Sequence, residues 1–140
     1  MRKITVLLCA FLVLTSFDKR ELDQEFDIVG EWEGVDESGE SGGFSFDSEG
    51  YVIMTKGGIK MGGKNFDNNG KKLSLTYRFD SKPKPAHLDI IVKEEGGESR
   101  TMLLLIKIVD KNTMVMAQEG PGARPKSFTQ DNSMTFKRTQ

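Results

Sequence analysis

The residues that could do chemistry are few, and His87 is the only histidine among them. A Ser-His-Asp hydrolase would have to use it together with an acid such as Asp89. A zinc site needs further histidine or cysteine ligands beside it. The single cysteine, Cys9, lies in a segment that we expect to be removed. We therefore predict no catalytic residue, no metal and no cofactor, and a protein that is not an enzyme.

The segment Gly58–Lys64 has the spacing G-x-x-x-x-G-K of a phosphate-binding loop. In such a loop a serine or threonine follows the lysine to ligate magnesium, and a helix begins with its N-terminus facing the phosphates. Here Asn65 follows, and residues 66–70 (Phe-Asp-Asn-Asn-Gly) are typical of a turn. We interpret the glycines as marks of a bent or bulged strand and expect no nucleotide binding.

Two groups of carboxylates have spacings that resemble functional sites. Glu31 and Glu33 fall on one face of an extended segment, but they flank Trp32. If Trp32 points inward, both carboxylates face water, which is the ordinary place for charge. The turn Asp47–Gly50 resembles the start of a calcium loop, but its glycine comes fourth, whereas an EF-hand needs glycine at the sixth position. We predict an ordinary turn there.

The elements that would position these residues are strands. In Lys72–Phe79, apolar residues alternate with polar ones, as in a sheet with one face exposed to water. Other strands are expected at 27–33, 44–46, 51–54, 88–93, 100–109, 113–118 and 133–138, with a bent one near 58–64. That gives nine strands, or ten if the pair Gly62-Gly63 divides one.

Short strands separated by frequent turns predict an all-β fold, here an antiparallel up-and-down β-barrel of about 8–10 strands. Trp32 in the first strand would plug one end, and Arg138 in the last strand would lie across its ring as a cation–π partner. The first and last strands are therefore expected to meet. With nine strands, the acidic loop at 36–40 and the basic loop at Lys82–Lys84 share a rim, and Arg124 lies at the opposite end.

The expected inner face is rich in aromatic residues and in methionines, which adapt to varied apolar guests. These side chains either line a ligand cavity or fill the barrel, as in small barrels of about eight strands. The sequence leaves both alternatives open. The inward set is Phe44, Phe46, Tyr77, Phe79, Leu88, Ile90, Met102, Leu104, Met114, Met116 and Phe136.

Residues 1–16 have the composition of a secretory signal peptide. Two basic residues precede the apolar run Ile4–Leu14, and small polar residues follow it. The run is shorter than the about 20 residues that span a bilayer. Lipid attachment at Cys9 would need a small residue before it, and Leu8 is not small. We expect export to the periplasm or beyond, with no lipid anchor and no transmembrane segment in the mature chain.

Residues 17–26 form a leader between the signal peptide and the barrel. Asp18 followed by Glu21 fits a helix-capping pattern, and Leu22 and Phe26 share one helical face. The leader is either a short helix that covers a barrel end or a disordered acidic segment. Residues 27–140 are expected to form one barrel domain, because a chain of this size holds a single core.

The charges are balanced overall but divided along the chain. Residues 18–49 contain twelve acidic and two basic residues, a balance of −10, whereas residues 50–140 contain nine acidic and sixteen basic residues, a balance of +7. A net charge of −1 for the whole chain gives no reason to expect a nucleic-acid partner. The two halves either form separate charged faces or neutralise each other across the barrel.

Several of these features resemble a known family. Gly30-x-Trp32 near the start, with Arg138 in the final strand, resembles the calycin pattern of lipocalins and fatty-acid-binding proteins. Three further segments resemble a lipocalin-like family of small, mostly uncharacterised exported bacterial proteins: Phe44-Ser45-Phe46, Lys82–Asp89 and Arg124–Phe128, followed by the ending Phe136-Lys137-Arg138. The resemblance implies a calycin-like barrel with structural roles for Gly30, Trp32, Phe136 and Arg138. It implies no activity.

Two functional hypotheses follow. In the first, the protein is an exported carrier of a small apolar or amphipathic ligand. Its inner face, with Phe44, Phe46, Tyr77, Phe79, Leu88, Ile90, Met102, Leu104 and Met116, holds the apolar part, and Lys82, Lys84 or Arg124 holds an acidic head group. In the second, the barrel is filled and recognises an envelope protein through its rims. The oligomeric state is left open.

Overall fold

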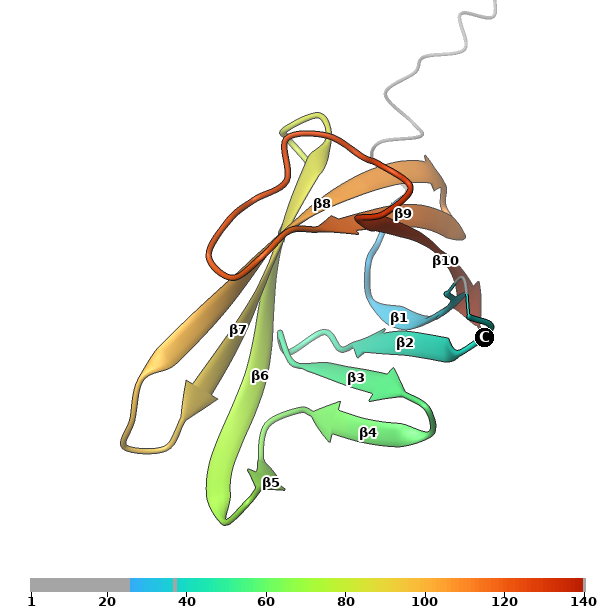
Figure 1. Ribbon diagram of the computed structural model, residues 1–140. Helices are drawn as coiled ribbons and strands as arrows, with labels where there is room; N and C mark the ends of the chain where they lie inside the picture. Colours follow the sequence, from blue (N-terminus) through green and yellow to red (C-terminus); the bar gives the residue numbers. More distant parts are fainter. Residues whose placement is uncertain (1–25, 37, 140) are drawn as a thin grey trace, which may run out of the picture.

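A computed structural model of the chain describes residues 26–36 and 38–139, in which ten antiparallel strands form one sheet that curls into a nearly closed barrel (Figure 1). The predicted all-β barrel is confirmed, with the larger of the two expected strand counts. The predicted signal peptide and most of the predicted leader helix lie outside the described residues. No helix in the described part is long and apolar enough to cross a membrane. The strands are β1 (Gly30–Val35), β2 (Ser41–Phe46), β3 (Val52–Lys56), β4 (Ile59–Gly62), β5 (Phe66–Asn68), β6 (Lys71–Asp80), β7 (Ala86–Glu94), β8 (Ser99–Asp110), β9 (Thr113–Gln118) and β10 (Ser133–Thr139).

The first and last strands of the barrel pair with each other, as predicted. β1 and β10 run antiparallel, with Trp32 opposite Arg138. The guanidinium carbon of Arg138 lies 4.3 Å from the centre of the Trp32 ring, which confirms the expected cation–π contact. Gly30 makes room for this arrangement, because a Cβ atom there would lie 2.6 Å from Nη1 of Arg138 and its φ is +135°.

Trp32 fills one end of the barrel, which we call the closed end. Its side chain is 2% exposed, and its Nε1 donates a hydrogen bond to the carbonyl of Ile28 at 2.9 Å. Phe26 packs between the rings of Trp32 and Phe79, with ring centres 5.8 and 5.7 Å away. The leader therefore covers this end at least through its last residue, Phe26.

The glycine-rich segment that resembles a phosphate loop contains a full reversal of the chain. Gly57 and Gly58, both with positive φ, turn the chain from β3 into β4. β4 ends at Gly62, where a Cβ atom would lie 2.3 Å from the carbonyl oxygen of Val52. The prediction of one bent strand is therefore wrong, and the alternative that divides it at Gly62-Gly63 holds.

The additional reversal at Gly62-Gly63, between β4 and β5, also corrects the predicted sorting of loops between the two ends. β6 runs antiparallel to β3 at the bridge between Tyr51 and Thr76, so β6 travels toward the closed end and the β6–β7 turn lies there. The β1–β2 loop, with Asp36 and Glu40, lies at the other end, which we call the open end. The acidic loop and the basic turn thus do not share a rim.

The barrel closes between β3 and β6 by only a few hydrogen bonds. The amide of Leu75 donates to the carbonyl of Gly63 at 2.9 Å, and that of Tyr77 donates to Gly50 at 2.9 Å. β4 and β5 are the two ends of the sheet, and they are not paired with each other. We call the gap between them the seam. The barrel is joined near the closed end and separated at the seam.

Aspartates organise the turns. Oδ1 of Asp36 accepts hydrogen bonds from the amides of Ser38 and Glu40 and from the Ser38 hydroxyl, and these bonds lower the pKa of Asp36. Asp47 accepts from the amides of Glu49 and Tyr51 in the same way. The acidic turn at Asp47–Gly50 is therefore an ordinary turn, as predicted, in which the carboxylate bonds its own backbone.

Candidate functional site

The inner face of the barrel is apolar, and it divides into a packed half and an exposed half. Toward the closed end and on strands β7 to β10, the core residues are buried. The predicted inward set is confirmed as inward: seven members belong to the buried core, and Phe44, Tyr77, Phe79 and Met102 pack against it while keeping some exposure. The buried seven are Phe46, Leu88, Ile90, Leu104, Met114, Met116 and Phe136.

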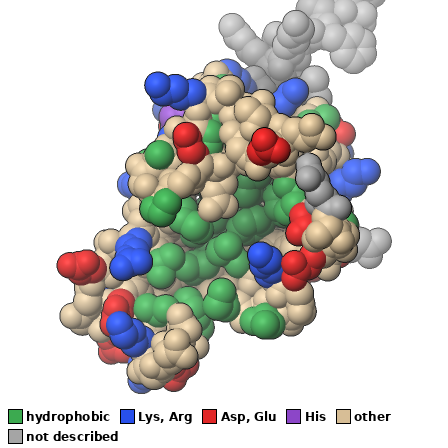
Figure 2. All heavy atoms as spheres, viewed as in Figure 1, with side chains coloured by type: hydrophobic (Ala, Val, Ile, Leu, Met, Phe, Trp, Pro, Cys, Tyr) green, Lys and Arg blue, Asp and Glu red, His purple; other side chains and the backbone are tan. Residues whose placement is uncertain are grey.

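The exposed half forms an apolar hollow. Figure 2 shows hydrophobic side chains gathered at the centre of one face, between β6 and the strands β2–β4. By strand alternation and register, the half-buried inner residues of this region include Met54, Phe66 and Leu73. On β4, the inner residues Ile59 and Met61 are 69% and 49% exposed. Contiguous exposed apolar surface of this kind makes the hollow the candidate site.

Aromatic rings form the floor between the packed half and the hollow. Phe44 stacks on Phe46 at 5.7 Å and meets Phe136 edge-on at 5.3 Å. Phe46 meets Tyr77 edge-on at 4.9 Å. The Tyr77 hydroxyl donates to the carbonyl of Asp47 at 2.6 Å, and burial raises the pKa of this tyrosine. The floor is an apolar surface whose one polar group, the Tyr77 hydroxyl, is already hydrogen-bonded.

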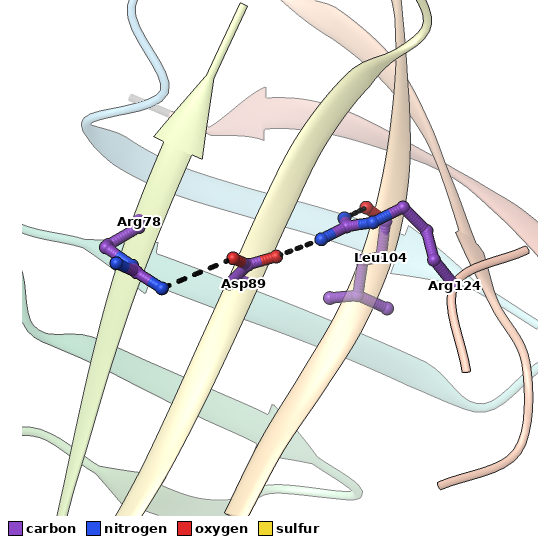
Figure 3. Close-up of polar contacts among 4 residues, drawn as sticks. All are labelled: Arg78, Asp89, Leu104 and Arg124. Atoms are coloured by element: carbon purple, nitrogen blue, oxygen red, sulfur yellow. Dashed lines mark hydrogen bonds and ion pairs between the residues drawn. The ribbon is translucent and has the colours of Figure 1, made fainter. Parts of the chain in front are cut away.

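A second cluster of chemically capable residues lies on the outer face of the barrel. Asp89 points outward, because its neighbours Leu88 and Ile90 point inward and are fully buried. Figure 3 shows its carboxylate between Arg78 of β6 and Arg124 of the 119–132 loop. Nη2 of Arg124 lies 2.5 Å from Oδ1 of Asp89, and Nη1 donates to the carbonyl of Leu104 at 2.6 Å. Arg124 thus binds β7 and β8 at once.

The contacts of Arg124 explain two buried residues that do not belong to the barrel interior. Leu105 and Ala117 are opposite each other on the outer faces of β8 and β9, and both are buried. Pro125, next to Arg124, is buried as well. We infer that the 119–132 loop covers an outer apolar strip and that the ion pair of Arg124 with Asp89 fastens it there. The guanidinium predicted to hold a ligand head group is engaged by the protein itself.

We expect Arg124→Gln to detach this loop and to lower the free energy of unfolding by about 1–3 kcal/mol, because the partly buried carboxylate of Asp89 loses its closest partner. Urea unfolding and amide hydrogen exchange of β8 and β9 measure the effect. The matched control is Arg78→Gln, which removes a 3.7 Å ion pair of a guanidinium that is 77% exposed and costs at most about 1 kcal/mol. Equal effects of the two substitutions would contradict the fastening role.

The remaining predicted head-group residues lie far along the barrel from the hollow. Lys82 and Lys84 are exposed in the β6–β7 turn at the closed end, where the amide of Lys82 donates to Asp80. His87 is the second residue of β7, opposite Asp80 and Leu105. The structure therefore brings the apolar inner residues together but places Lys82, Lys84 and Arg124 elsewhere.

One serine motif is present that the sequence reasoning missed. Gly39-Glu40-Ser41-Gly42-Gly43 has the spacing G-x-S-x-G of a hydrolase nucleophile. A nucleophile elbow joins a strand to a helix, whereas Ser41 begins β2 at the open end and His87 lies toward the closed end. Over residues 26–36 and 38–139, no three histidine, cysteine or acidic side chains are grouped to hold a metal ion.

Two pockets, distinct from the apolar hollow, lie on the outer surface of the barrel. The first, about 260 Å³, is lined mainly by outward positions of β1–β4, including Glu31, Ser45 and Thr55. The second, about 530 Å³, lies beside Arg78, His87 and Asp89. Both are open to solvent and lined by polar and apolar atoms alike. Comparison with protein-family models, with curated proteins and with solved structures finds no match to this chain.

Proposed function

We propose that this protein is a carrier that holds a small apolar or amphipathic ligand in the hollow on the inner face of its barrel. The observation that supports this most directly is the exposure of the inner residues of β4, Ile59 and Met61, beside the half-buried Met54, Phe66 and Leu73. Leaving this surface in water costs about 25 cal/mol for each Å² that a ligand could cover. A flexible alkyl chain suits a hollow lined by methionines, because these side chains adapt to the guest.

The architecture agrees with the lipocalin-like resemblance. A first strand carrying Gly30 and Trp32 pairs with a last strand carrying Arg138, and the interior is apolar. The proposal includes export through a signal peptide at residues 1–16. A carrier that binds apolar molecules outside the cytoplasm needs no energy source and no catalytic group.

The test uses decanol, a neutral alkyl ligand, titrated into the mature protein (residues 17–140) by isothermal calorimetry. We expect saturable binding near one ligand per chain. Met54→Gln, on the inner face of β3, is expected to weaken it about tenfold, because a polar group then faces the alkyl chain. Ile53→Gln is the matched control, since Ile53 directly precedes Met54 on the same strand but lies on the outer face. Absence of saturable binding, or equal loss in both variants, would refute the carrier.

A second candidate is supported by the packed half of the barrel. Val52, Leu88, Ile90, Ile106 and Met114 are fully buried, and this packing leaves the rims as the surfaces for recognition. A barrel of this kind would act as an envelope interaction module without a ligand. Crosslinking in its own host would then recover a defined protein partner, and decanol would not bind.

A further inference from the structure

β4 is an end strand of the sheet, and one of its two edges pairs with no strand of the barrel. The other edge pairs with β3, in a register that sets Lys56 opposite Ile59. Within the part of the chain that the structure describes, β5 is the other end strand of the sheet and lies across the seam without pairing with β4. Figure 1 shows β4 as the outermost of the strands β1–β4. A strand edge in this position is a template for pairing with another chain.

The hydrogen-bond pattern identifies the backbone groups that this edge offers. In an antiparallel pair, alternate residues bond the strand on one side, and the residues between them point to the other side. The amide of Gly63 donates to the carbonyl of Val52 at 2.8 Å. The odd-numbered residues of β4 therefore bond β3. The amide and carbonyl groups of Lys60 and Gly62 point to the side away from β3, and we call these groups the free edge.

Apolar side chains line the free edge on the inner face of the barrel. Ile59 and Met61 point to the hollow and are 69% and 49% exposed. Edge strands that are protected against pairing are short or carry charged residues or proline. β4 is short, but its two inner side chains are large and aliphatic, so a strand added beside it would bury them. Free amide and carbonyl groups next to exposed aliphatic side chains form the kind of surface that β-strand addition uses.

The outer face of the free edge is cationic. Residues 56–64 contain three lysines and no acid, and Lys60 is exposed on the outer face of β4. Glu31 and Glu33 line the same outer pocket as Lys60, but they belong to β1, three strands away in the sheet. Glu40 lies before β2, with its carboxylate beside the β3–β4 turn. Among the described residues, no acid forms an ion pair with Lys60.

This charge determines which kind of strand fits the free edge. Pairing with the same edge of a second copy would bring together two segments that each carry three lysines and no acid. Like charges on adjacent strands destabilise their pairing, and lysines on an edge strand oppose self-association. A strand with acidic side chains on its outer face is attracted instead. Its residues at the alternate positions face the hollow, where apolar side chains are favoured.

We propose that the free edge of β4 binds an extended segment of a partner protein by β-strand addition, and that this segment alternates acidic and apolar residues. An acidic residue opposite Lys60 exchanges backbone hydrogen bonds with it and places its carboxylate on the outer face, next to the ammonium group. The apolar neighbours of that residue cover Ile59 and Met61. This inference goes beyond the carrier function, because it requires no ligand in the hollow.

The experiment titrates the mature protein (residues 17–140) with capped seven-residue peptides by isothermal calorimetry. The first peptide alternates glutamate and valine, with glutamate at both ends, and the second has lysine in place of each glutamate. The third has the sequence of the first with its two middle glutamates N-methylated, which keeps the side chains but removes two amide donors. We expect the first peptide to bind saturably, near one per chain, and at least about tenfold tighter than either of the others. Its advantage over the lysine peptide should decrease as salt rises.

Two variants of equal charge change locate the binding site. Lys60→Glu is expected to bind the glutamate peptide about tenfold more weakly, because like charges then face each other across the strand pair. Lys93→Glu is the matched control and should bind as the native protein does, since Lys93 is exposed on β7, which is paired with β6 and β8 on its two sides. In the native protein, the bound peptide should slow amide hydrogen exchange at Lys60 and Gly62.

Absence of binding by the glutamate peptide, equal binding of its N-methylated form, or equal loss in the two variants would overturn the inference. Dimerisation of the protein alone that Lys60→Glu abolishes would assign the edge to a second copy of the chain. Binding to anionic vesicles without binding of the peptide would assign it to a membrane surface. Either result also overturns the inference. The decanol titration tests the carrier separately, so failure of one proposal is distinguishable from failure of the other.

Discussion

Trp32→Ala is expected to unfold the barrel or to leave it barely stable. The indole is almost completely buried, contacts Phe26, and satisfies the carbonyl of Ile28 through its Nε1. Truncation of a buried tryptophan costs about 3–5 kcal/mol, against a total stability of about 5–15 kcal/mol for a domain. The measurement is thermal and urea unfolding followed by circular dichroism, since Trp32 is the only tryptophan and its fluorescence is lost with it.

A conservative variant distinguishes the specific role of the Trp32 indole from a general loss of packing. Trp32→Phe keeps an aromatic ring under Arg138 and against Phe26, but it cannot donate to Ile28. We expect it to fold with a stability between those of the native chain and Trp32→Ala. A melting temperature of Trp32→Ala within a few degrees of the native one would refute the view that this side chain closes the barrel.

Arg138→Lys is the second substitution for which we expect a large effect, about 2–4 kcal/mol, although the charge is kept. The guanidinium donates to the carbonyls of Val29 at 2.7 Å, Asp27 at 2.6 Å and Lys111 at 2.9 Å. It also covers the Trp32 ring. A lysine ammonium is a compact point donor and does not reproduce the planar fork that reaches three carbonyls and stacks on an indole. Bonds from a charged donor are worth about 1.5–3 kcal/mol each.

The midpoint of urea unfolding measures this loss, and amide hydrogen exchange locates it. We expect faster exchange at the closed end, in the β8–β9 turn and in β1, because Arg138 joins these segments. Lys137→Ala is the control, since this neighbouring residue is exposed and should change stability by at most about 0.5 kcal/mol. If the two variants were equally stable, the carbonyl contacts of Arg138 would not contribute to the fold.

Sequence reasoning predicted well those features in which the residue type and its local spacing determine where the side chain lies. Alternation in Lys72–Phe79 predicts β6 and its inner face, because side chains in a strand point to opposite sides in turn. The pairing of Trp32 with Arg138 was predicted because a single tryptophan favours a buried site and because a curled sheet closes by pairing its first strand with its last. The aspartates at the turns are likewise local, because each carboxylate bonds amides a few residues away.

The features that were missed depend on contacts that no local pattern contains. β5 has only three residues, and Phe66–Asn68 is surrounded by turn-forming residues, so alternation had no length over which to appear. The burial of Leu105 on the outer face of β8, which we attribute to cover by the 119–132 loop, is a second such feature. One signal was available: β8 is apolar on both faces from Met102 to Ile106, as expected of a strand covered on both sides.

The residues of the candidate site likewise divide into those that the sequence predicted and those that it did not. The inner residues were predicted as a set, because burial follows the two-residue period. The cationic residues were not, because the count of reversals decides which loops share an end, and the reversal at Gly62-Gly63, between β4 and β5, adds one. The pairing of Arg124 with Asp89, 35 residues apart, could not be deduced from composition or spacing.

The joining of β1 to β10 determines when this chain can finish folding. Contacts such as that between Arg138 and Val29 connect residues 109 positions apart, so the barrel has a high contact order and a slow closing step. Until the final strand is in place, β1 and β9 each present an unpaired edge, the kind of template on which chains aggregate. These two edges are therefore covered only when the last seven-residue strand, β10, takes its place between them.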